Sequence, residues 1–280
     1  MNARPTKRML RVDGLVLAAD CYGEPKARTV IFAHVGCQSR TAWRGAARAA
    51  AAAGYYAISL DLRGHGDSDW ASDGDYHFAA YVRDYAAIIA EHGGEAALVG
   101  ASLGGRTALL MCTTHPQMVG ALALADVTPR IDEDAASDMR AFFHHSAQGF
   151  ASVDEAAHAL ASLTEDKTPA PAARLLPHLR EQDGRFHWRW DPRFVQERFV
   201  ADEAQLQLLE DSARALATPT IMIRAEFSTV VRTEHVAEFE RTSPHIETQV
   251  ARGIGHMLTS DANDAYAPMI LDFFARTYPP

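Results

Sequence analysis

The chain has 280 residues, of which 48% are hydrophobic and 22% are charged, a composition typical of a globular protein with enough apolar material for a core. Its 27 lysines and arginines and 36 aspartates and glutamates give a net charge of −9, which disfavours nucleic acids and anionic membrane surfaces as partners. The three cysteines are widely separated and form no CxxC pair, so we expect neither a disulfide framework nor a common zinc motif. With no secretory signal and no apolar run of about 18 residues, a cytoplasmic protein that does not enter membranes is expected.

In the first half of the chain, short apolar runs alternate with helical patterns. A β-hairpin is predicted at the start, because Asp13-Gly14 is typical of a two-residue turn and apolar runs lie on both sides of it. The runs that predict buried strands are Thr29–Ala33, Tyr55–Leu60, Ala96–Val99 and Ala121–Ala125. The helical patterns between them cover an alanine-rich segment that ends at Ala53, Phe78–Ala90 and about Leu103–Thr113. Strands separated regularly by helices favour a parallel sheet with helices on both faces.

This alternation is interrupted after Asp126. Residues 129–217 are mostly helical in pattern and contain several prolines. The alternation resumes with a strand at Thr220–Arg224, a helix near Thr233–Arg241, a strand at Glu247–Val250 and a helix near Asp264–Arg276. An insertion between two strands of such a sheet most often lies over the edge where ligands bind. We therefore expect a core of residues 1–128 and 218–280, and a helical cap of residues 129–217 inserted between strands 6 and 7.

The segment Gly100-Ala101-Ser102-Leu103-Gly104 follows a predicted strand and starts a predicted helix, which is the context that a G-x-S-x-G nucleophile motif requires. The turn is so sharp that larger side chains beside the serine would clash, and the serine hydroxyl projects from a strained backbone. Its position at a helix N-terminus also favours negative charge. We therefore predict that Ser102 is a nucleophile.

Attack on an ester or amide produces an alkoxide, which backbone N–H groups can stabilise. The N–H of Leu103 is one predicted donor, because it directly follows the nucleophile. The second is expected in the loop after Thr29–Ala33, where Gly36 lets the backbone approach a ligand closely. Val35 and Cys37 beside it are predicted to line the substrate pocket, with Cys37 a small lining residue rather than a nucleophile.

His256 lies in a glycine-bounded loop after the last predicted strand, and we predict that it is the general base. A carboxylate should hold its imidazole in the right tautomer and stabilise the imidazolium. The loop in which this acid usually stands has Ser228 and Thr229 instead of an aspartate. Asp126, directly after a predicted strand, is the favoured acid. Two alternatives stay open: Glu226 is the acid, or the chain has no functional acid.

Together, these residues resemble the serine α/β-hydrolase superfamily over almost the whole chain. More narrowly, four segments are similar to a group of bacterial capped hydrolases labelled esterase, peroxidase-like or epoxide-hydrolase-like: Gly100–Gly105, Asp126–Arg130, Gly149–Ala156 and Trp188–Pro192. The resemblance implies an α/β-hydrolase fold, with a mostly parallel, doubly wound sheet and an inserted helical cap. The chain departs from its relatives at Val35 and Ala225, where they carry glycine, and at Thr229, where they carry aspartate.

A serine at this turn, without metal or cofactor motifs, points to acyl transfer. It excludes the chemistry of epoxide hydrolases and haloalkane dehalogenases, which attack with an aspartate at the same position. We therefore expect a serine hydrolase that needs no cofactor and cleaves a small-molecule carboxylic ester or lactone through an acyl-enzyme. Phe142, Phe150 and Trp188 of the cap are expected either to contact this substrate or to form the core of the cap itself.

Two other functions stay open. The same fold hosts cofactor-free dioxygenases, in which a His–Asp pair deprotonates an aromatic substrate and no acyl-enzyme forms. Loss of the usual acid would also fit a ligand-binding homologue without turnover. Neither the physiological substrate nor the oligomeric state is predicted by the sequence.

Overall fold

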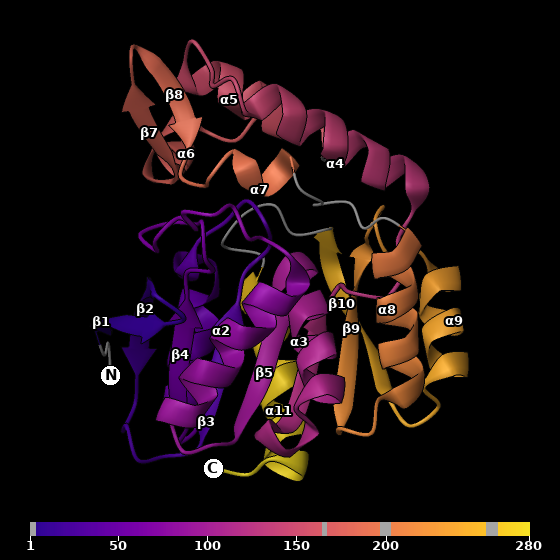
Figure 1. Ribbon diagram of the computed structural model, residues 1–280. Helices are drawn as coiled ribbons and strands as arrows, with labels where there is room; N and C mark the ends of the chain where they lie inside the picture. Colours follow the sequence, from indigo (N-terminus) through magenta and orange to yellow (C-terminus); the bar gives the residue numbers. More distant parts are fainter. Residues whose placement is uncertain (1–3, 164–166, 197–202, 256–262) are drawn as a thin grey trace.

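The structure is a computed structural model that describes residues 4–163, 167–196, 203–255 and 263–280 (Figure 1). Its largest sheet has eight strands in the order β1-β2-β4-β3-β5-β6-β9-β10. These strands are β1 (Thr6–Val12), β2 (Leu15–Tyr22), β3 (Thr29–Ala33), β4 (Tyr56–Leu60), β5 (Ala96–Ala101), β6 (Val119–Ala125), β9 (Thr220–Phe227) and β10 (Glu247–Gly255). All neighbours from β4 to β10 pair in parallel, whereas β1 and β2 run antiparallel at one edge. The predicted, mostly parallel sheet is therefore confirmed.

Helices cover both faces of this sheet, as the doubly wound prediction requires (Figure 1). In β3, Val30 and Phe32 pack into one layer, whereas Ile31 and Ala33 pack into the other. A strand buried on both faces is apolar throughout, which explains its uninterrupted hydrophobic run. The first layer contains α1 (Arg44–Ala52) and α11 (Ala267–Thr277), and the second contains α2 (Phe78–Glu91), α3 (Ser102–Thr114), α8 (Glu203–Ala215) and α9 (Thr233–Thr242).

The N-terminal hairpin forms as predicted. Val12 pairs with Leu15, and the turn between them places Asp13 and Gly14 at φ angles of 44° and 80°. Positive φ at both turn residues gives the mirror-image turn that matches the twist of two antiparallel strands. The Asp-Gly pair therefore determines the register of β1 on β2.

Between β6 and β9 the chain leaves the sheet and forms a layer of small elements above the carboxyl ends of the strands (Figure 1). They are α4 (Glu133–Ser146), α5 (Val153–Ala161), α6 (Ala172–Leu175), β7 (Leu179–Gln182), β8 (Arg185–Trp188) and α7 (Arg193–Gln196). The helical pattern expected here missed β7 and β8, which form an antiparallel hairpin. Its turn is again an Asp-Gly pair, with φ angles of 52° at Asp183 and 73° at Gly184. Helix α8 packs instead against α3, at the side of the sheet.

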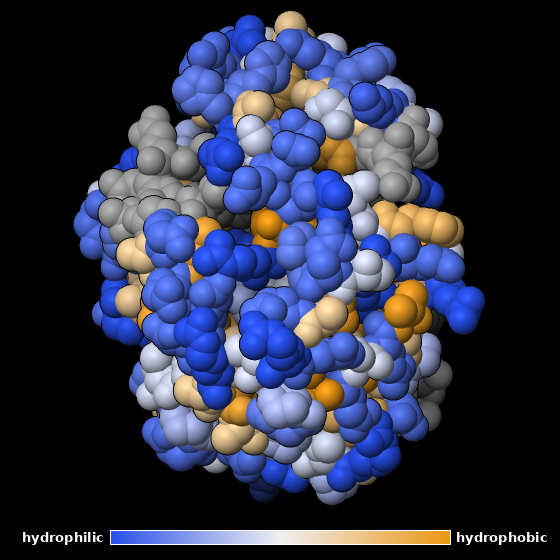
Figure 2. Space-filling view, turned by 90° about the vertical axis from the view of Figure 1, so that its right-hand side faces the viewer, coloured by the Kyte–Doolittle hydropathy of each residue, from blue (hydrophilic) through white to orange (hydrophobic). Residues whose placement is uncertain are grey.

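Short 3-10 helices at Arg40–Trp43, Pro116–Met118, Leu176–His178 and Asp264–Tyr266 complete the described elements. No helix in the described part of the chain is long and apolar enough to cross a bilayer. The face that carries α8 and α9 is mostly hydrophilic, with apolar residues scattered over it (Figure 2). Scattered apolar residues of this kind are common on protein surfaces and indicate no site by themselves.

Candidate active site

The turn between β5 and α3 holds Ser102 in a left-handed backbone conformation. Its φ angle is 45°, which costs a non-glycine residue about 1–3 kcal/mol and persists only where packing enforces it. A Cβ atom on Gly100 would lie 2.5 Å from the backbone of Gly105, and one on Gly104 would lie 2.6 Å from the carbonyl oxygen of Ala33. The close approach of α3 to β5 and β3 therefore requires these glycines and fixes the sharp turn at Ser102.

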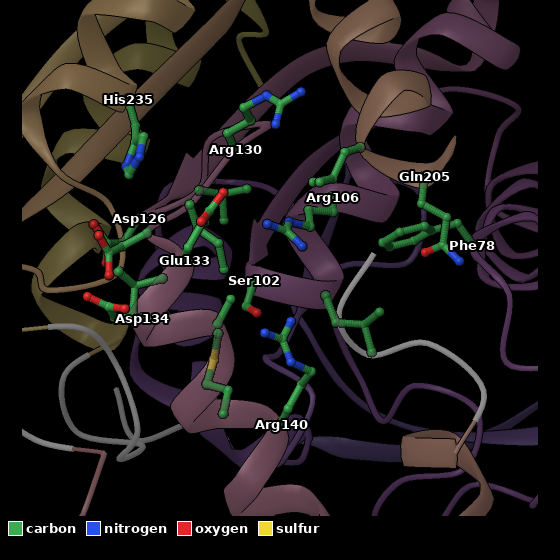
Figure 3. Close-up of a pocket in the computed structure, with 18 of the residues that line it drawn as sticks. Phe78, Ser102, Arg106, Asp126, Arg130, Glu133, Asp134, Arg140, Gln205 and His235 are labelled. Atoms are coloured by element: carbon green, nitrogen blue, oxygen red, sulfur yellow. The ribbon is translucent and has the colours of Figure 1, made fainter. Parts of the chain in front are cut away.

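Ser102 lines a cavity of about 610 Å³ at the carboxyl edge of the sheet (Figure 3). Leu103 and Arg106 of α3 share its wall with Asp126, which follows β6, and with the first turn of α4. A cavity of this size suits a small molecule. The structure thus brings together three of the predicted site residues, Ser102, Leu103 and Asp126.

The carboxylate of Asp126 is held between β6 and the loop after β9. Asp126 has a φ angle of 55°, and only 2% of its surface is exposed. One carboxylate oxygen accepts a hydrogen bond from the backbone N–H of Ala225 at 3.0 Å, and the other accepts one from Oγ of Ser228 at 2.7 Å. Asp126 therefore lies against the loop after β9, which is the loop where the similar capped hydrolases carry an aspartate.

Ser228 shows how this loop is built without a carboxylate of its own. Its hydroxyl donates to Asp126 and accepts a hydrogen bond from the backbone N–H of Val231 at 2.9 Å. The guanidinium of Arg224 donates to three backbone carbonyl oxygens of the same loop, at distances between 2.7 and 3.3 Å. These bonds from Arg224 fix the conformation of the loop, and in this conformation the hydroxyl of Ser228 reaches the carboxylate of Asp126.

Glu226, the alternative acid, is directed elsewhere. Its carboxylate accepts a hydrogen bond from the backbone N–H of Gly253 in β10 at 2.7 Å, and it is not among the residues that line the cavity of Ser102. Strand β10 ends at Gly255. The predicted base, His256, lies outside the described residues.

Two buried histidines hold the loop after β3, where the second oxyanion donor is predicted. The ring of His65 lies between two carbonyl oxygens, that of Gly36 at 2.9 Å from Nε2 and that of Arg63 at 3.0 Å from Nδ1. Nε2 of His34 accepts the backbone N–H of Leu62 at 3.1 Å, while its Nδ1 donates to the carbonyl oxygen of Val35 at 2.7 Å. Burial lowers the pKa of both imidazoles, and His34, whose Nε2 accepts a hydrogen bond, is neutral. These contacts give His34 a structural role in the loop.

The other predicted contact residues are not among those that line the cavity of Ser102. Cys37 and Trp188 line a second cavity, of about 480 Å³, and burial raises the pKa of the Cys37 thiol to about 12, which makes it a poor nucleophile at neutral pH. Phe142 and Phe150 pack against Trp188, with ring centroids 6.1 and 6.0 Å away. These three aromatic side chains are buried in the layer above the sheet, and Val35 is buried in the layer of α1 and α11.

Sequence reasoning missed Arg106, which lies one helical turn after Ser102 on the same face of α3. Its surface is only 8% exposed, and within the described residues it has no hydrogen-bond or ion-pair partner. Burial lowers the pKa of Arg106 to about 10. The spacing of four residues from a predicted nucleophile is the signal that could have identified it.

Comparisons with known proteins agree with this fold. The family described as alpha/beta hydrolase fold matches residues 28–263. An esterase of Mycobacterium tuberculosis is 29% identical over 270 residues, which cover 92% of this chain and 86% of the relative. The mouse sn-1-specific diacylglycerol lipase is 25% identical over 262 residues, covering 90% of this chain and 83% of the relative.

Solved structures give the same result. The crystal structure of E-2-(acetamidomethylene)succinate hydrolase has a TM-score of 0.79 at 21% identity, with 98% of each chain covered. A structure of the M. tuberculosis esterase has a TM-score of 0.72 at 26% identity, covering 96% of this chain and 92% of the other. Because the family match spans most of the sequence, this chain belongs to the alpha/beta hydrolase family, in which the relatives similar to it are named as esterases and other hydrolases.

Proposed function

We propose that this chain is a serine hydrolase that cleaves carboxylic esters or lactones through an acyl-enzyme on Ser102. The observation that carries the proposal is a serine with a left-handed backbone in the wall of a cavity that also contains the buried carboxylate of Asp126. Family membership supports hydrolysis, and the relatives include an esterase and a lipase. Because these relatives are named for different activities, they favour no particular acyl group for the substrate of this chain.

In the proposed reaction, Oγ of Ser102 attacks the carbonyl carbon while His256 takes the serine proton. The N–H groups of Leu103 and Gly36 stabilise the resulting oxyanion. The bond between the carbonyl carbon and the alcohol oxygen then breaks, and His256 gives its proton to the leaving alcohol. Water, activated by His256, hydrolyses the acyl-enzyme, which releases the carboxylic acid and regenerates Ser102.

Asp126 is proposed to orient His256 and to stabilise its imidazolium form. Its bonds to Ala225 and Ser228 support this role, because they hold the carboxylate against the loop where relatives have their acid. We also propose that the elements from α4 to α7 act as a cap that limits the access of water to the cavity. The position of the first turn of α4 in the cavity wall supports this.

The proposal is tested by incubating the protein with a fluorophosphonate and measuring its intact mass, alongside turnover of 4-nitrophenyl butyrate. We expect one adduct per chain and ester hydrolysis for the parent, and neither for Ser102→Ala. Absence of both in the parent would contradict the proposal and favour the ligand-binding alternative. Oxygen uptake with a hydroxy-aromatic compound, without an adduct, would instead favour the dioxygenase.

A further inference from the structure

Arg106 differs from the buried Arg40 and Arg63 in having no counter-charge among the described residues. Arg63 donates two hydrogen bonds to the carboxylate of Asp84, at 2.6 and 2.7 Å. Arg40 is paired with several carboxylates, among them Asp61. Nothing comparable surrounds Arg106 in the described part of the chain, where its Nη2 atom is buried without a partner.

The position of Arg106 is fixed relative to Ser102. The two residues are four apart in α3, so they lie on the same face, about 6 Å apart along the helix axis. Helical side chains lean toward the N-terminus of their helix, which directs Arg106 back toward the turn that carries Ser102. Both residues line the same cavity, and Figure 3 shows the guanidinium group turned toward the region around the Ser102 hydroxyl.

The acidic groups of the cavity do not neutralise Arg106. The carboxylate of Asp126 is bound to Ala225 and Ser228. Asp132, which also lines the cavity, is paired with Arg232. Glu133 and Asp134 line the cavity too, but they are exposed on the first turn of α4, where water screens their charge. Burial is the cause of the lowered pKa of Arg106, yet at about 10 the group remains protonated at neutral pH.

A second arginine with no partner in the described structure reaches the same cavity. Arg140 of α4 is exposed, lines the cavity and is turned toward Ser102 in Figure 3. In contrast, Arg130, another lining residue, is already paired with Glu210 and Glu203. The cavity therefore combines one buried and one exposed guanidinium whose donors are not used by the residues that the structure describes.

A buried cation without a partner is costly, and Arg106 loses the hydration that its donors would have in water. A carboxylate of a bound ligand would supply both the missing charge and the missing acceptors, because guanidinium and carboxylate groups match in geometry. We propose that Arg106 binds a carboxylate group of the substrate, assisted by Arg140, so that this enzyme acts on esters that carry a free carboxylate close to the scissile bond. Hemiesters of short dicarboxylic acids have this chemistry. The ester part of the inference rests on the proposed function, whereas the carboxylate site does not.

Binding of monomethyl glutarate to the Ser102→Ala variant tests the carboxylate site without turnover, with dimethyl glutarate as the uncharged probe. We expect monomethyl glutarate to bind more tightly, and Arg106→Met in the same background to weaken its binding by roughly 10- to 100-fold. Arg106→Lys should retain part of the preference because it keeps the charge. Arg130→Met is the matched control within the cavity wall, with an effect of about fivefold or less. Circular dichroism of each variant checks its fold.

Equal affinity for the two probes, or equal affinity of the Ser102→Ala protein with and without Arg106→Met, would overturn the proposal. Hydrolysis is measured separately with the parent, using 4-nitrophenyl hydrogen glutarate and 4-nitrophenyl hexanoate. If the parent hydrolyses neither ester but binding of monomethyl glutarate still depends on Arg106, the carboxylate site stands and the proposed esterase function fails. If the parent hydrolyses only the neutral ester and the Ser102→Ala variant binds both probes equally, the esterase function stands and the carboxylate site fails.

Discussion

The two halves of the carboxyl edge of the sheet use the same kinds of side chain in opposite ways. In the half formed by β3 and β4, the buried cations are neutralised within the protein: Arg40 pairs with Asp61, and Arg63 pairs with Asp84. The loops there are further fixed by the buried histidines His34 and His65. In this closed half, these charged and imidazole side chains serve the fold, whereas the backbone N–H of Gly36 is assigned to the proposed reaction.

In the half formed by β5 and β6, the polar groups face a cavity. Ser102 and Asp126 have left-handed backbones, and Arg106 is buried without a counter-charge among the described residues. Buried polar groups in proteins are normally satisfied, so the strained backbone of Ser102 and the guanidinium of Arg106, which no described group neutralises, need another explanation. The difference between the halves indicates that one stabilises the sheet edge while the other is prepared for a ligand.

The largest expected effect is on kcat and comes from Asp126, the proposed acid in the half that faces the cavity (the open half). Asp126→Asn should lower kcat for a 4-nitrophenyl ester by about 10³ to 10⁴, because an amide in this place would no longer stabilise the imidazolium of His256. Glu226→Gln is the matched control and should stay close to the parent. A larger loss in Glu226→Gln than in Asp126→Asn would identify Glu226 as the acid.

The next prediction concerns stability and compares two buried arginines. Arg63→Met should reduce the free energy of unfolding by about 3–5 kcal/mol, because it leaves the carboxylate of Asp84 buried without its partner. Arg106→Met leaves no such carboxylate and removes a cation that is buried without a partner among the described residues, so it should not lower the free energy of unfolding. Urea denaturation of both variants gives the values. Similar losses in both would contradict the distinction between the two halves.

The features that the sequence predicted correctly are local or follow from strand order. The Asp13-Gly14 turn and the strand–turn–helix around Ser102 depend on adjacent residues. The position of Asp126 directly after a strand is local too, whereas its nearness to the loop after β9, which was not predicted, follows from β6 and β9 being neighbours in the sheet. His256 remains a prediction, since it lies outside the described residues.

Other features depend on tertiary packing and could not be read from the chain. Whether Arg106 has a partner is decided by side chains that are distant in sequence. The burial of Phe142 and Trp188 against each other, rather than beside Ser102, is likewise a result of packing. The β7–β8 hairpin was missed although Asp183-Gly184 gave a turn signal, because the surrounding pattern was mostly helical.

A smaller effect on kcat is expected at Ser228, whose hydroxyl donates a hydrogen bond to Asp126. Ser228→Ala removes one hydrogen bond to the Asp126 carboxylate and should lower kcat by about tenfold, while Ala225 still binds the other oxygen. Ester kinetics under saturating substrate measure the change. Thr229→Ala, at the next position, is the control with no expected loss. An unchanged kcat for Ser228→Ala would show that this bond does not matter for the reaction.

The smallest effect is a pH dependence in the closed half. Burial lowers the pKa of His34 in the folded protein. Below about pH 6.5 the unfolded chain therefore binds more protons than the folded one, and the free energy of unfolding decreases as the pH is lowered. The slope from one histidine cannot exceed about 1.4 kcal/mol per pH unit. In His34→Gln, urea denaturation between pH 7 and pH 5.5 should give a shallower slope than in the parent. An identical slope would contradict the neutral, structural role of His34.

The central claim is that the open half performs acyl transfer on Ser102. Rapid acid quenching during turnover of 4-nitrophenyl acetate, followed by peptide mass mapping, tests it directly. The account predicts an acetyl group on the peptide that contains Ser102 and a burst of nitrophenolate close to one per chain. Turnover with no acyl group on Ser102, or with the acyl group on another residue such as Cys37, would contradict it.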